Sequence, residues 1–330
     1  MESFKAYRIH ETAGKVSGRF DQVTLDDLAA GEVVIRVAYS SVNYKDALAA
    51  TGAGKIIRRF PCVGGIDLSG TVEQSSDARF RTGDAVIATS YDIGVSHDGG
   101  YAEYARIPAD WIVPLPAGLT LAQAMALGTA GYTAALGVLR MEHNGLKPAN
   151  GPVIVTGATG GVGSIAIDIL SGLGYEVTAL TGKEDRTEYL KSLGAREVML
   201  RRDLDLSRIR PLDRTLWAGA VDNLGGEVLA WIASTMRPWG TIASIGLAAS
   251  MELKTTVAPF ILRGACLLGI DSANTPMAMR SEVWRRLASD MKPSHLGPMT
   301  RTIAFADLPQ AFQPLIDGHA IGRTVVKIAA

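Results

Sequence analysis

A glycine-rich turn at residues 156–163 constrains the fold of this chain more than any other feature of its sequence. The turn, Thr-Gly-Ala-Thr-Gly-Gly-Val-Gly, follows the apolar run Val153–Thr156 and precedes apolar residues at helical spacing over 164–173. Closely spaced glycines let the backbone N–H groups at a helix N-terminus approach a pyrophosphate. The strand–turn–helix context makes the motif more specific than its glycines alone, although a turn that needs glycine only for packing is the alternative. We predict that a dinucleotide is bound by Thr159, Gly160, Gly161, Val162 and Gly163.

Strand-like and helical patterns alternate after this turn. Short apolar runs at 175–180, 218–222 and 241–245 are typical of strands, and residues 188–193 have a helical pattern closed by Gly194. This alternation predicts an α/β domain with a doubly wound parallel sheet of the Rossmann type.

The first third of the chain has a different pattern. Its β-branched and apolar runs at 33–37, 71–73 and 85–88 are separated by glycine and aspartate, which indicates a mostly antiparallel β domain. Near the end of the chain, helical patterns at 280–291 and 307–316 and strand patterns at 301–305 and 324–328 indicate a return to that domain. We therefore predict two domains, the β domain comprising 1–125 and 274–330 and the parallel-sheet domain comprising 126–273. A helix is expected from residue 120, with Thr120 as its N-cap.

The strand after the glycine turn ends in Thr181-Gly182-Lys183, where an NAD site usually has a carboxylate for the ribose 2′-hydroxyl. Lys183, together with Arg201 after the third strand, offers positive charge to a 2′-phosphate, so we predict NADPH as the cofactor. Glu184 and Asp185 are assigned to the start of the next helix, where acidic side chains are favoured. Solvated surface charges are the alternative for Lys183 and Arg201. The predicted cofactor site also includes Thr181, Gly182, Leu247 at a strand end, Ile261, Ser272 and Tyr44.

Composition narrows the classes of partner. The chain has 33 basic and 33 acidic residues, and this balance gives no general attraction to nucleic acid. Its two cysteines, Cys62 and Cys266, form no Cys-x-x-Cys pair, and the five histidines share no ligand spacing, so we predict no metal site. The charged N-terminus and the lack of a long apolar run predict neither a signal peptide nor a membrane span, so we expect a soluble cytoplasmic protein.

End to end, the sequence resembles the zinc-independent quinone oxidoreductases of the medium-chain dehydrogenase/reductase superfamily. The segments that carry the resemblance are 40–46 (Ser-Ser-Val-Asn-Tyr-Lys-Asp), 64–70, 128–134, the glycine turn and 322–326. Within that group it is most similar to the acrylyl-CoA reductase branch, through residues 43–46, 54–58, 217–220 and 259–263. The resemblance implies a GroES-like catalytic domain beside the Rossmann domain, and a homodimer.

Zinc-dependent relatives have a cysteine near residues 43–44 and a Gly-His-Glu near residues 64–67. This chain has Asn-Tyr-Lys-Asp and Gly-Gly-Ile-Asp there, and it lacks the four-cysteine structural zinc lobe. Alcohol oxidation would lose its usual Lewis acid, whereas reduction of an activated C=C bond needs only a hydride, a donor to the carbonyl oxygen and a proton source. The resemblance thus implies NADPH-dependent reduction of acrylyl-CoA, or a similar short 2-enoyl-CoA, to propanoyl-CoA.

Tyr44 is the first candidate for a catalytic contact, because its hydroxyl can donate to a substrate carbonyl; a buried structural tyrosine is the alternative. Asn43 and Arg323 are further catalytic candidates, although asparagine also serves in turns. Some enoyl reductases of the superfamily have a tyrosine shortly after this segment, but residues 52–56 contain none.

Lys55, Arg58 and Arg59 suit the phosphates of coenzyme A, with a solvated loop as the alternative. This group of cations favours an enoyl-CoA over a quinone. Two other functions stay open: an NADPH:quinone oxidoreductase and a non-catalytic NADPH-binding protein. A homodimer is also expected from the apolar run at 265–270, because an apolar edge strand needs a cover or a partner.

Overall fold

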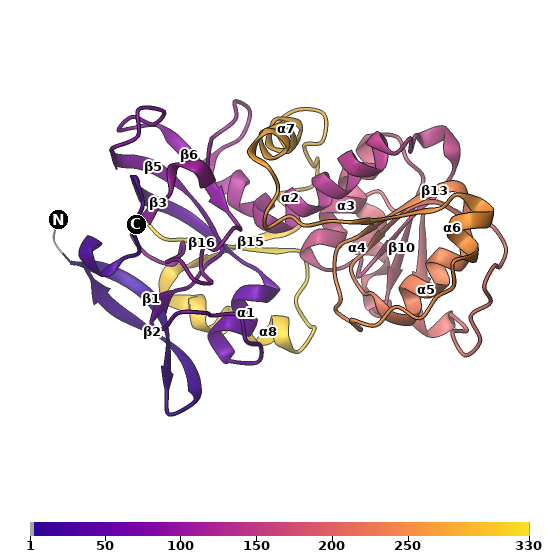
Figure 1. The fold of residues 1–330 in the computed structure, drawn as a ribbon, viewed down its shortest axis with the longest axis horizontal. Coiled ribbons are helices and arrows are strands. Elements are labelled where there is room, and N and C mark those ends of the chain that lie inside the picture. Colours follow the sequence, from indigo (N-terminus) through magenta and orange to yellow (C-terminus); the bar gives the residue numbers. More distant parts are fainter. Residues whose placement is uncertain (1–2, 330) are drawn as a thin grey trace. The chain divides into compact units, whose positions relative to one another are not determined.

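The computed structural model describes residues 3–329, which form two compact units. The first unit contains the chain up to Thr129, Ser272–Ala288 and the residues from Leu296 onward. The second contains Ala130–Asp271 and Ser289–His295. Figure 1 labels many of their helices and strands.

The first unit is built on two sheets (Figure 1). In the larger one the strand order is β15-β16-β3-β5-β6-β8, with β7 also paired to β3. Its strands are β3 (Val33–Val42), β5 (Asp67–Ser75), β6 (Ala85–Thr89), β7 (Tyr104–Ile107), β8 (Ile112–Pro114), β15 (Thr300–Ala304) and β16 (Arg323–Lys327). The smaller sheet consists of β1 (Phe4–Thr12), β2 (Lys15–Val23) and β4 (Cys62–Val63). Only the β15–β16 pair of these described strands is parallel, so the predicted mostly antiparallel β fold is confirmed.

The second unit has one six-stranded sheet in the order β11-β10-β9-β12-β13-β14 (magenta to orange in Figure 1). The strands are β9 (Val153–Thr156), β10 (Val177–Thr181), β11 (Glu197–Leu200), β12 (Trp217–Asp222), β13 (Met236–Ser244) and β14 (Cys266–Gly269). All described pairs in it are parallel, and the order is that of a Rossmann fold. Its helices are α3 (Gly161–Gly172), α4 (Thr187–Ser192), α5 (Gly226–Thr235) and α6 (Ala258–Arg263). The predicted doubly wound sheet is confirmed.

The remaining helices are α1 (Tyr44–Thr51), α2 (Leu121–His143), α7 (Met277–Leu287) and α8 (Gln313–Ile316). Thr120 caps α2 as expected, since Gln123 N donates to Thr120 Oγ1 at 3.2 Å. The helix predicted over 307–316, interrupted by two prolines, is divided in the structure: a 3-10 segment, Phe305–Ala311, precedes α8, because Pro309 and Pro314 lack the N–H that a continuous helix needs. No helix among residues 3–329 is both long and apolar enough to cross a bilayer.

Helix α2 bends at Gly128, where φ is 51° and ψ is −155°. This conformation is essentially reserved for glycine. A side chain there would also collide with its neighbours, because a Cβ atom would lie 2.6 Å from Asp67 Oδ2 and 2.7 Å from Arg323 Nη2. The bend therefore brings the backbone of α2 against polar side chains of β5 and β16.

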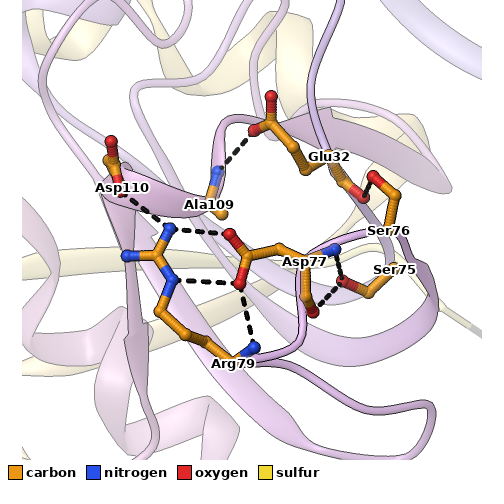
Figure 2. A network of polar contacts seen from close by, with 7 residues as sticks. All are labelled: Glu32, Ser75, Ser76, Asp77, Arg79, Ala109 and Asp110. Carbon is orange, nitrogen blue, oxygen red and sulfur yellow. Dashed lines mark hydrogen bonds and ion pairs between the residues drawn. The ribbon is translucent and has the colours of Figure 1, made fainter.

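A network of ion pairs lies on the surface of the first unit, after β5 (Figure 2). Arg79 donates to both carboxylate oxygens of Asp77, at 3.0 and 2.8 Å, and to Asp110 at 2.7 Å. The network ties the turn after β5 to the 3-10 segment Ala109–Trp111, whose first N–H donates to Glu32.

Candidate functional site

A cavity of about 260 Å³ in the second unit lies at the carboxyl ends of β9 and β10. It is lined by Gly157, Thr159, Leu180, Thr181, Gly182, Lys183, Arg201 and Leu224. Open α/β sheets bind ligands at this edge of the sheet. The structure thus brings together the glycine turn and the cations that the sequence assigned to one cofactor.

The glycine turn packs tightly because Gly163 has no side chain. A Cβ atom there would lie 2.4 Å from the carbonyl oxygen of Gly157. Helix α3 begins at Gly161, so its first N–H groups have no partner within the helix and suit a pyrophosphate. The half-buried Gly160, Gly161 and Val162 form the end of the turn.

Two polar residues at the end of β12 hold this turn in place. Asn223 Nδ2 donates to the carbonyl oxygen of Thr156 at 2.7 Å, and Thr156 Oγ1 donates to Asp222 Oδ1 at 2.7 Å. Burial raises the pKa of Asp222. Asn223 and Leu224 were not predicted, and their position directly after a parallel strand was the only signal for them.

Lys183 and Arg201 line the same cavity, and the acidic residues after Lys183 do not. Glu184 instead pairs with Arg202 at 2.7 Å and begins a 3-10 segment, Glu184–Arg186. Partial burial, and then the charge of Arg186, lower the pKa of Lys183. Two cations and the Thr181 hydroxyl, with no carboxylate among the lining residues, fit the 2′-phosphate of NADPH.

The residues that line this cavity do not include the predicted cofactor residues Tyr44, Leu247, Ile261 and Ser272. Leu247 and Ile261 are 59% and 71% exposed on the second unit, and neither lines the cavity. Ser272 belongs to the first unit, where its carbonyl oxygen accepts a hydrogen bond from Arg280. Their assignment to the cofactor stays a prediction.

In the first unit, Tyr44 is the first residue of α1 and its side chain is 51% exposed. Asn43, directly before it, is buried and caps the helix. The Asn43 amide has a fixed orientation: its Nδ2 donates to Asp67 Oδ2 at 2.8 Å and to Asp46 Oδ2 at 3.1 Å, and its Oδ1 accepts from Arg323 Nη1 at 3.1 Å. Tyr44 is thus accessible, whereas Asn43 is committed to its protein partners.

Arg323, the first residue of β16, is only 3% exposed. Besides Asn43, its guanidinium donates to the Ala126 carbonyl and to Ser41 Oγ, both at 2.9 Å. Burial lowers the pKa of Arg323. The structure joins Arg323 to Asn43, but the groups that it binds are all part of the protein interior.

Two buried carboxyl groups complete what we call the buried polar cluster: Ser41, Asn43, Asp46, Asp67, Thr129 and Arg323. Asp67 accepts from Ser41 Oγ at 2.6 Å, from Thr129 N at 2.9 Å and from Thr129 Oγ1 at 2.5 Å. Asp46 accepts from the backbone N–H groups of Asn43 at 2.8 Å and Ile66 at 2.9 Å. Burial, and then the nearby Asp67, raise the pKa of Asp46 to about 7.

The donor set of the cluster does not fit zinc. Its candidate ligands are two carboxylates and an amide, whose oxygens already accept hydrogen bonds from protein groups. Within residues 3–329, no three His, Cys, Asp or Glu side chains converge as metal ligands. We therefore derive no reaction step through zinc.

The cations predicted to bind coenzyme A have different surroundings. Lys55 and Arg58 are exposed, and Arg58 lies 3.8 Å from the half-exposed Asp92. Arg59 pairs at 2.7 Å with the buried Asp98, which also accepts from Ala29 N and Val63 N at 2.8 Å. Arg59 neutralises a buried carboxylate, which leaves Lys55 and Arg58 as the candidates for a phosphate.

Two family models match the sequence. The alcohol dehydrogenase GroES-like domain matches residues 29–117, and the zinc-binding dehydrogenase model matches residues 161–289.

Two curated proteins are similar over almost their whole length. The putative quinone oxidoreductase YhfP of Bacillus subtilis is 47% identical over 98% of this chain and 99% of its own. The acrylyl-CoA reductase AcuI of Ruegeria pomeroyi is 47% identical over 97% of both chains.

Solved structures are equally similar. The yhdH oxidoreductase of Salmonella enterica, in complex with NADP, has a TM-score of 0.96 and 46% identity, over 98% of this chain and 100% of that chain. YhfP of Bacillus subtilis, with NAD bound, has a TM-score of 0.97 and 46% identity, over 99% and 100% of the two chains.

Proposed function

Because this chain belongs to the medium-chain dehydrogenase/reductase family, we propose that it reduces the C=C bond of acrylyl-CoA, or of a similar short 2-enoyl-CoA, to give propanoyl-CoA. The protein is an oxidoreductase, and its cofactor is NADPH. Similarity alone supports both acrylyl-CoA reductases and a quinone oxidoreductase, so the observation that carries the choice of substrate is the exposure of the cations Lys55 and Arg58, which suit the phosphates of coenzyme A. We assign catalysis to the GroES-like domain, 1–125 and 274–330, and cofactor binding to the Rossmann domain, 126–273.

When bound, NADPH would supply the hydride that the β-carbon of the enoyl group accepts, and a water molecule would supply the proton that the α-carbon takes up. In this proposal Lys183, Arg201 and the Thr181 hydroxyl hold the 2′-phosphate, since they line one cavity. The N–H groups at the start of α3 bind the pyrophosphate. These residues thus contribute by binding and orienting the cofactor.

Tyr44 is proposed to donate a hydrogen bond to the thioester carbonyl oxygen. Negative charge develops on that oxygen as the β-carbon accepts hydride, and a donor fixed in place beforehand stabilises it. Tyr44 is the one member of the predicted catalytic set that is half exposed, while Asn43 and Arg323 are buried beneath the start of its helix. Lys55 and Arg58 are proposed to bind coenzyme A phosphates, because both are exposed cations near α1 in the sequence.

The test is steady-state oxidation of NADPH by the purified protein with acrylyl-CoA, longer 2-enoyl-CoAs and a simple quinone as acceptors. We expect turnover with acrylyl-CoA to exceed that with the quinone in kcat/KM. A quinone oxidoreductase is the second candidate, favoured by the name of the Bacillus subtilis relative, and faster quinone turnover would select it. NADPH binding without turnover of any acceptor would select a non-catalytic protein.

We also propose a homodimer in which β14 of two copies pair. β14 is an edge strand of its sheet, and the exposed apolar side chains of this unit include those of Trp239, Ile261, Leu262 and Leu267. An uncovered apolar edge favours association. Light scattering at micromolar protein should give twice the 34.9 kDa chain mass, and a monomer would contradict the proposal.

A cytoplasmic location is proposed from the cysteines. Cys62 and Cys266 are both free thiols, as suits a reducing compartment. Fractionation of the native cell tests it.

A further inference from the structure

The buried polar cluster places two carboxyl groups and one guanidinium directly beneath the start of α1. Asp67 is the carboxyl with more hydrogen bonds from the protein. It accepts four, one from Ser41, one from Asn43 and two from Thr129. The Thr129 hydroxyl donates its hydrogen bond to Asp67. The Ser90 hydroxyl, 2.9 Å away, must therefore be the donor to Thr129 Oγ1. These donors all point toward Asp67, which is the arrangement of an ionised carboxylate.

Asp46 is linked to Asp67 through a single amide group, the Nδ2 of Asn43, which donates to both. Asp46 also accepts from Asn43 N, so that Asn43 and Asp46 form a reciprocal cap on the first turn of α1. Arg323 fixes the other end of the same amide by donating to Asn43 Oδ1. The backbone that enters Tyr44 is therefore held by side chains from β5 and β16.

We propose that Asp46 and Asp67 are positioning residues that act through Asn43 to fix the first turn of α1 and the Tyr44 side chain that begins it. The proposal rests on the proposed function only in giving Tyr44 a role in catalysis. Neither carboxyl is exposed enough to contact a ligand, since Asp46 is 2% and Asp67 is 0% exposed. Their effect on the reaction is thus expected to pass through the geometry of Tyr44.

The charge state of the cluster gives this positioning a pH dependence. With both carboxyls ionised, the cluster carries one uncompensated negative charge, and burial together with Asp67 raises the pKa of Asp46 to about 7. Protonated Asp46 is a weaker acceptor for Asn43 N and Nδ2, so the cap loosens as pH falls through that value.

The ionisable groups that face Asp46 are Asp67 from β5, Arg323 from β16 and the Tyr101 hydroxyl, which donates to the Ser41 carbonyl oxygen at 3.0 Å. Strand β2 and helix α8 also pack on α1. Helix α8 has no charged residue, and in β2 Arg19 and Asp21 pair with each other while Lys15 is exposed. The pH dependence is therefore expected to follow Asp46 and to respond to Asp67.

Two isosteric variants separate this role from a general loss of structure. Asp67→Asn removes the charge beside Asp46 and keeps its hydrogen bonds, because the Thr129 hydroxyl can turn to accept from the new amide and donate to Ser90. Asp46→Asn removes the titrating group itself. A third variant, Tyr44→Phe, serves to assign the Tyr44 resonance in the NMR experiment below.

The experiment uses the whole protein without substrate, labelled with ring-¹³C tyrosine and followed by ¹H–¹³C NMR between about pH 5.5 and 8. In the parent, the chemical shift of the Tyr44 resonance should change with pH. Its midpoint should lie near pH 7, because the pKa of Asp46 is about 7. In Asp67→Asn the midpoint should move down by about one pH unit or more, because a like charge has been removed. In Asp46→Asn the shift should disappear. Tyr189, whose hydroxyl bonds to Ser164 in the second unit, is the internal control and should not follow these variants.

A Tyr44 resonance that does not titrate, or that titrates alike in the parent and both variants, would overturn the proposal. If Asp67→Asn does not fold, the parent and Asp46→Asn decide the question alone. The pH profile of kcat with acrylyl-CoA should follow the same midpoints. If the NMR midpoints behave as expected while acrylyl-CoA is not reduced, the proposed function fails and the positioning role stands.

Discussion

Two arginine–carboxylate networks in the first unit consist of similar groups and behave in opposite ways. One is the surface network of Asp77, Arg79 and Asp110 (Figure 2), in which the Arg79 side chain is 56% exposed. The other is the buried polar cluster, in which Arg323 lies between chain segments. Hydrogen bonds from Arg79 lower the pKa of Asp77 to about 2, whereas burial raises the pKa of Asp46 to about 7.

The difference shows that an arginine nearby does not by itself decide the charge state of a carboxyl group. At the surface, water solvates the ions and Arg79 binds Asp77 directly through two nitrogens. In the interior, one guanidinium serves two carboxyls, and it is linked to Asp67 through the Ser41 hydroxyl and the Asn43 amide. The buried pair therefore has too little positive charge to keep both members ionised at low cost.

The largest effect is expected from Gly128→Ala, which disturbs the buried cluster through the backbone. The new methyl group would have to displace Asp67 and Arg323 in a conformation that alanine disfavours. Strained backbone and a broken buried ion cluster together should lower the free energy of unfolding by about 4 kcal/mol. Chemical denaturation measures it. Gly172→Ala is the control, since nothing lies within 4 Å of its added methyl group, and it should be neutral or slightly stabilising. A near-neutral Gly128→Ala would show that the cluster tolerates rearrangement.

The next effect concerns the pH dependence of stability. The folded pKa of Asp46 is raised from 3.8 to about 7, so the folded chain retains a proton there that the unfolded chain loses. This carboxyl therefore destabilises the fold increasingly as pH rises from about 4 to about 7, by up to about 4 kcal/mol in all. Relative to the parent, Asp46→Asn should gain that stability over the same window, as measured by urea unfolding at several pH values.

Asp77→Asn is the matched control from the surface network. The pKa of Asp77 is depressed, so its contribution is present above pH 3.8 and lost as pH falls toward about 2. Between pH 5 and 8, its difference from the parent should stay constant. A parallel pH dependence for both variants would remove the distinction between the two networks.

An effect of intermediate size is expected from the partly buried cation Lys183. Lys183→Ala should raise KM for NADPH by about 10- to 100-fold, since a charged hydrogen bond is worth about 1.5–3 kcal/mol. KM for NADH should barely change, because NADH has no 2′-phosphate. Lys191→Ala is the control, as this exposed lysine pairs with Glu188 and does not line the cavity. Equal use of NADH and NADPH by the parent would contradict the assignment.

The smallest effect is expected from the exposed cations Lys55 and Arg58. The double alanine variant should raise KM for acrylyl-CoA a few-fold at low salt, and less at high salt, because water and ions screen both charges. Arg59 is left in place, since its removal would leave the buried carboxylate of Asp98 without its ion-pair partner. Lys15→Ala with Arg36→Ala, two exposed cations of the same unit, is the control. Unchanged kinetics at low salt would make Lys55 and Arg58 ordinary surface charges.

The cavity beside the glycine turn was predictable from sequence because most of its lining is local. The glycine turn, Lys183 and Arg201 sit at fixed places in successive βα units, and strand alternation gives those places directly. Leu224 and Asn223 were missed because strand ends have no residue signature of their own.

The buried cluster was only partly predictable. Asn43 and Arg323 were singled out separately, but nothing in the pattern indicated that they touch, or that Asp67 and Thr129 join them, because these residues come from four distant segments. The β1–β2 hairpin and α1 were also missed, since β2 has few buried residues and α1 spans only eight.

The bend of α2 at Gly128 has a consequence for the order in which the two units can fold during synthesis. On either side of the bend, Ala126 O accepts from Arg323, and Thr129 N donates to Asp67. Arg323 follows its partner Asn43 by 280 residues. On the ribosome, the two carboxyls and the bent helix therefore exist long before the cation that balances them. The first unit can reach its final packing only after β16 has emerged, whereas the six strands of the second unit's sheet are all synthesised earlier.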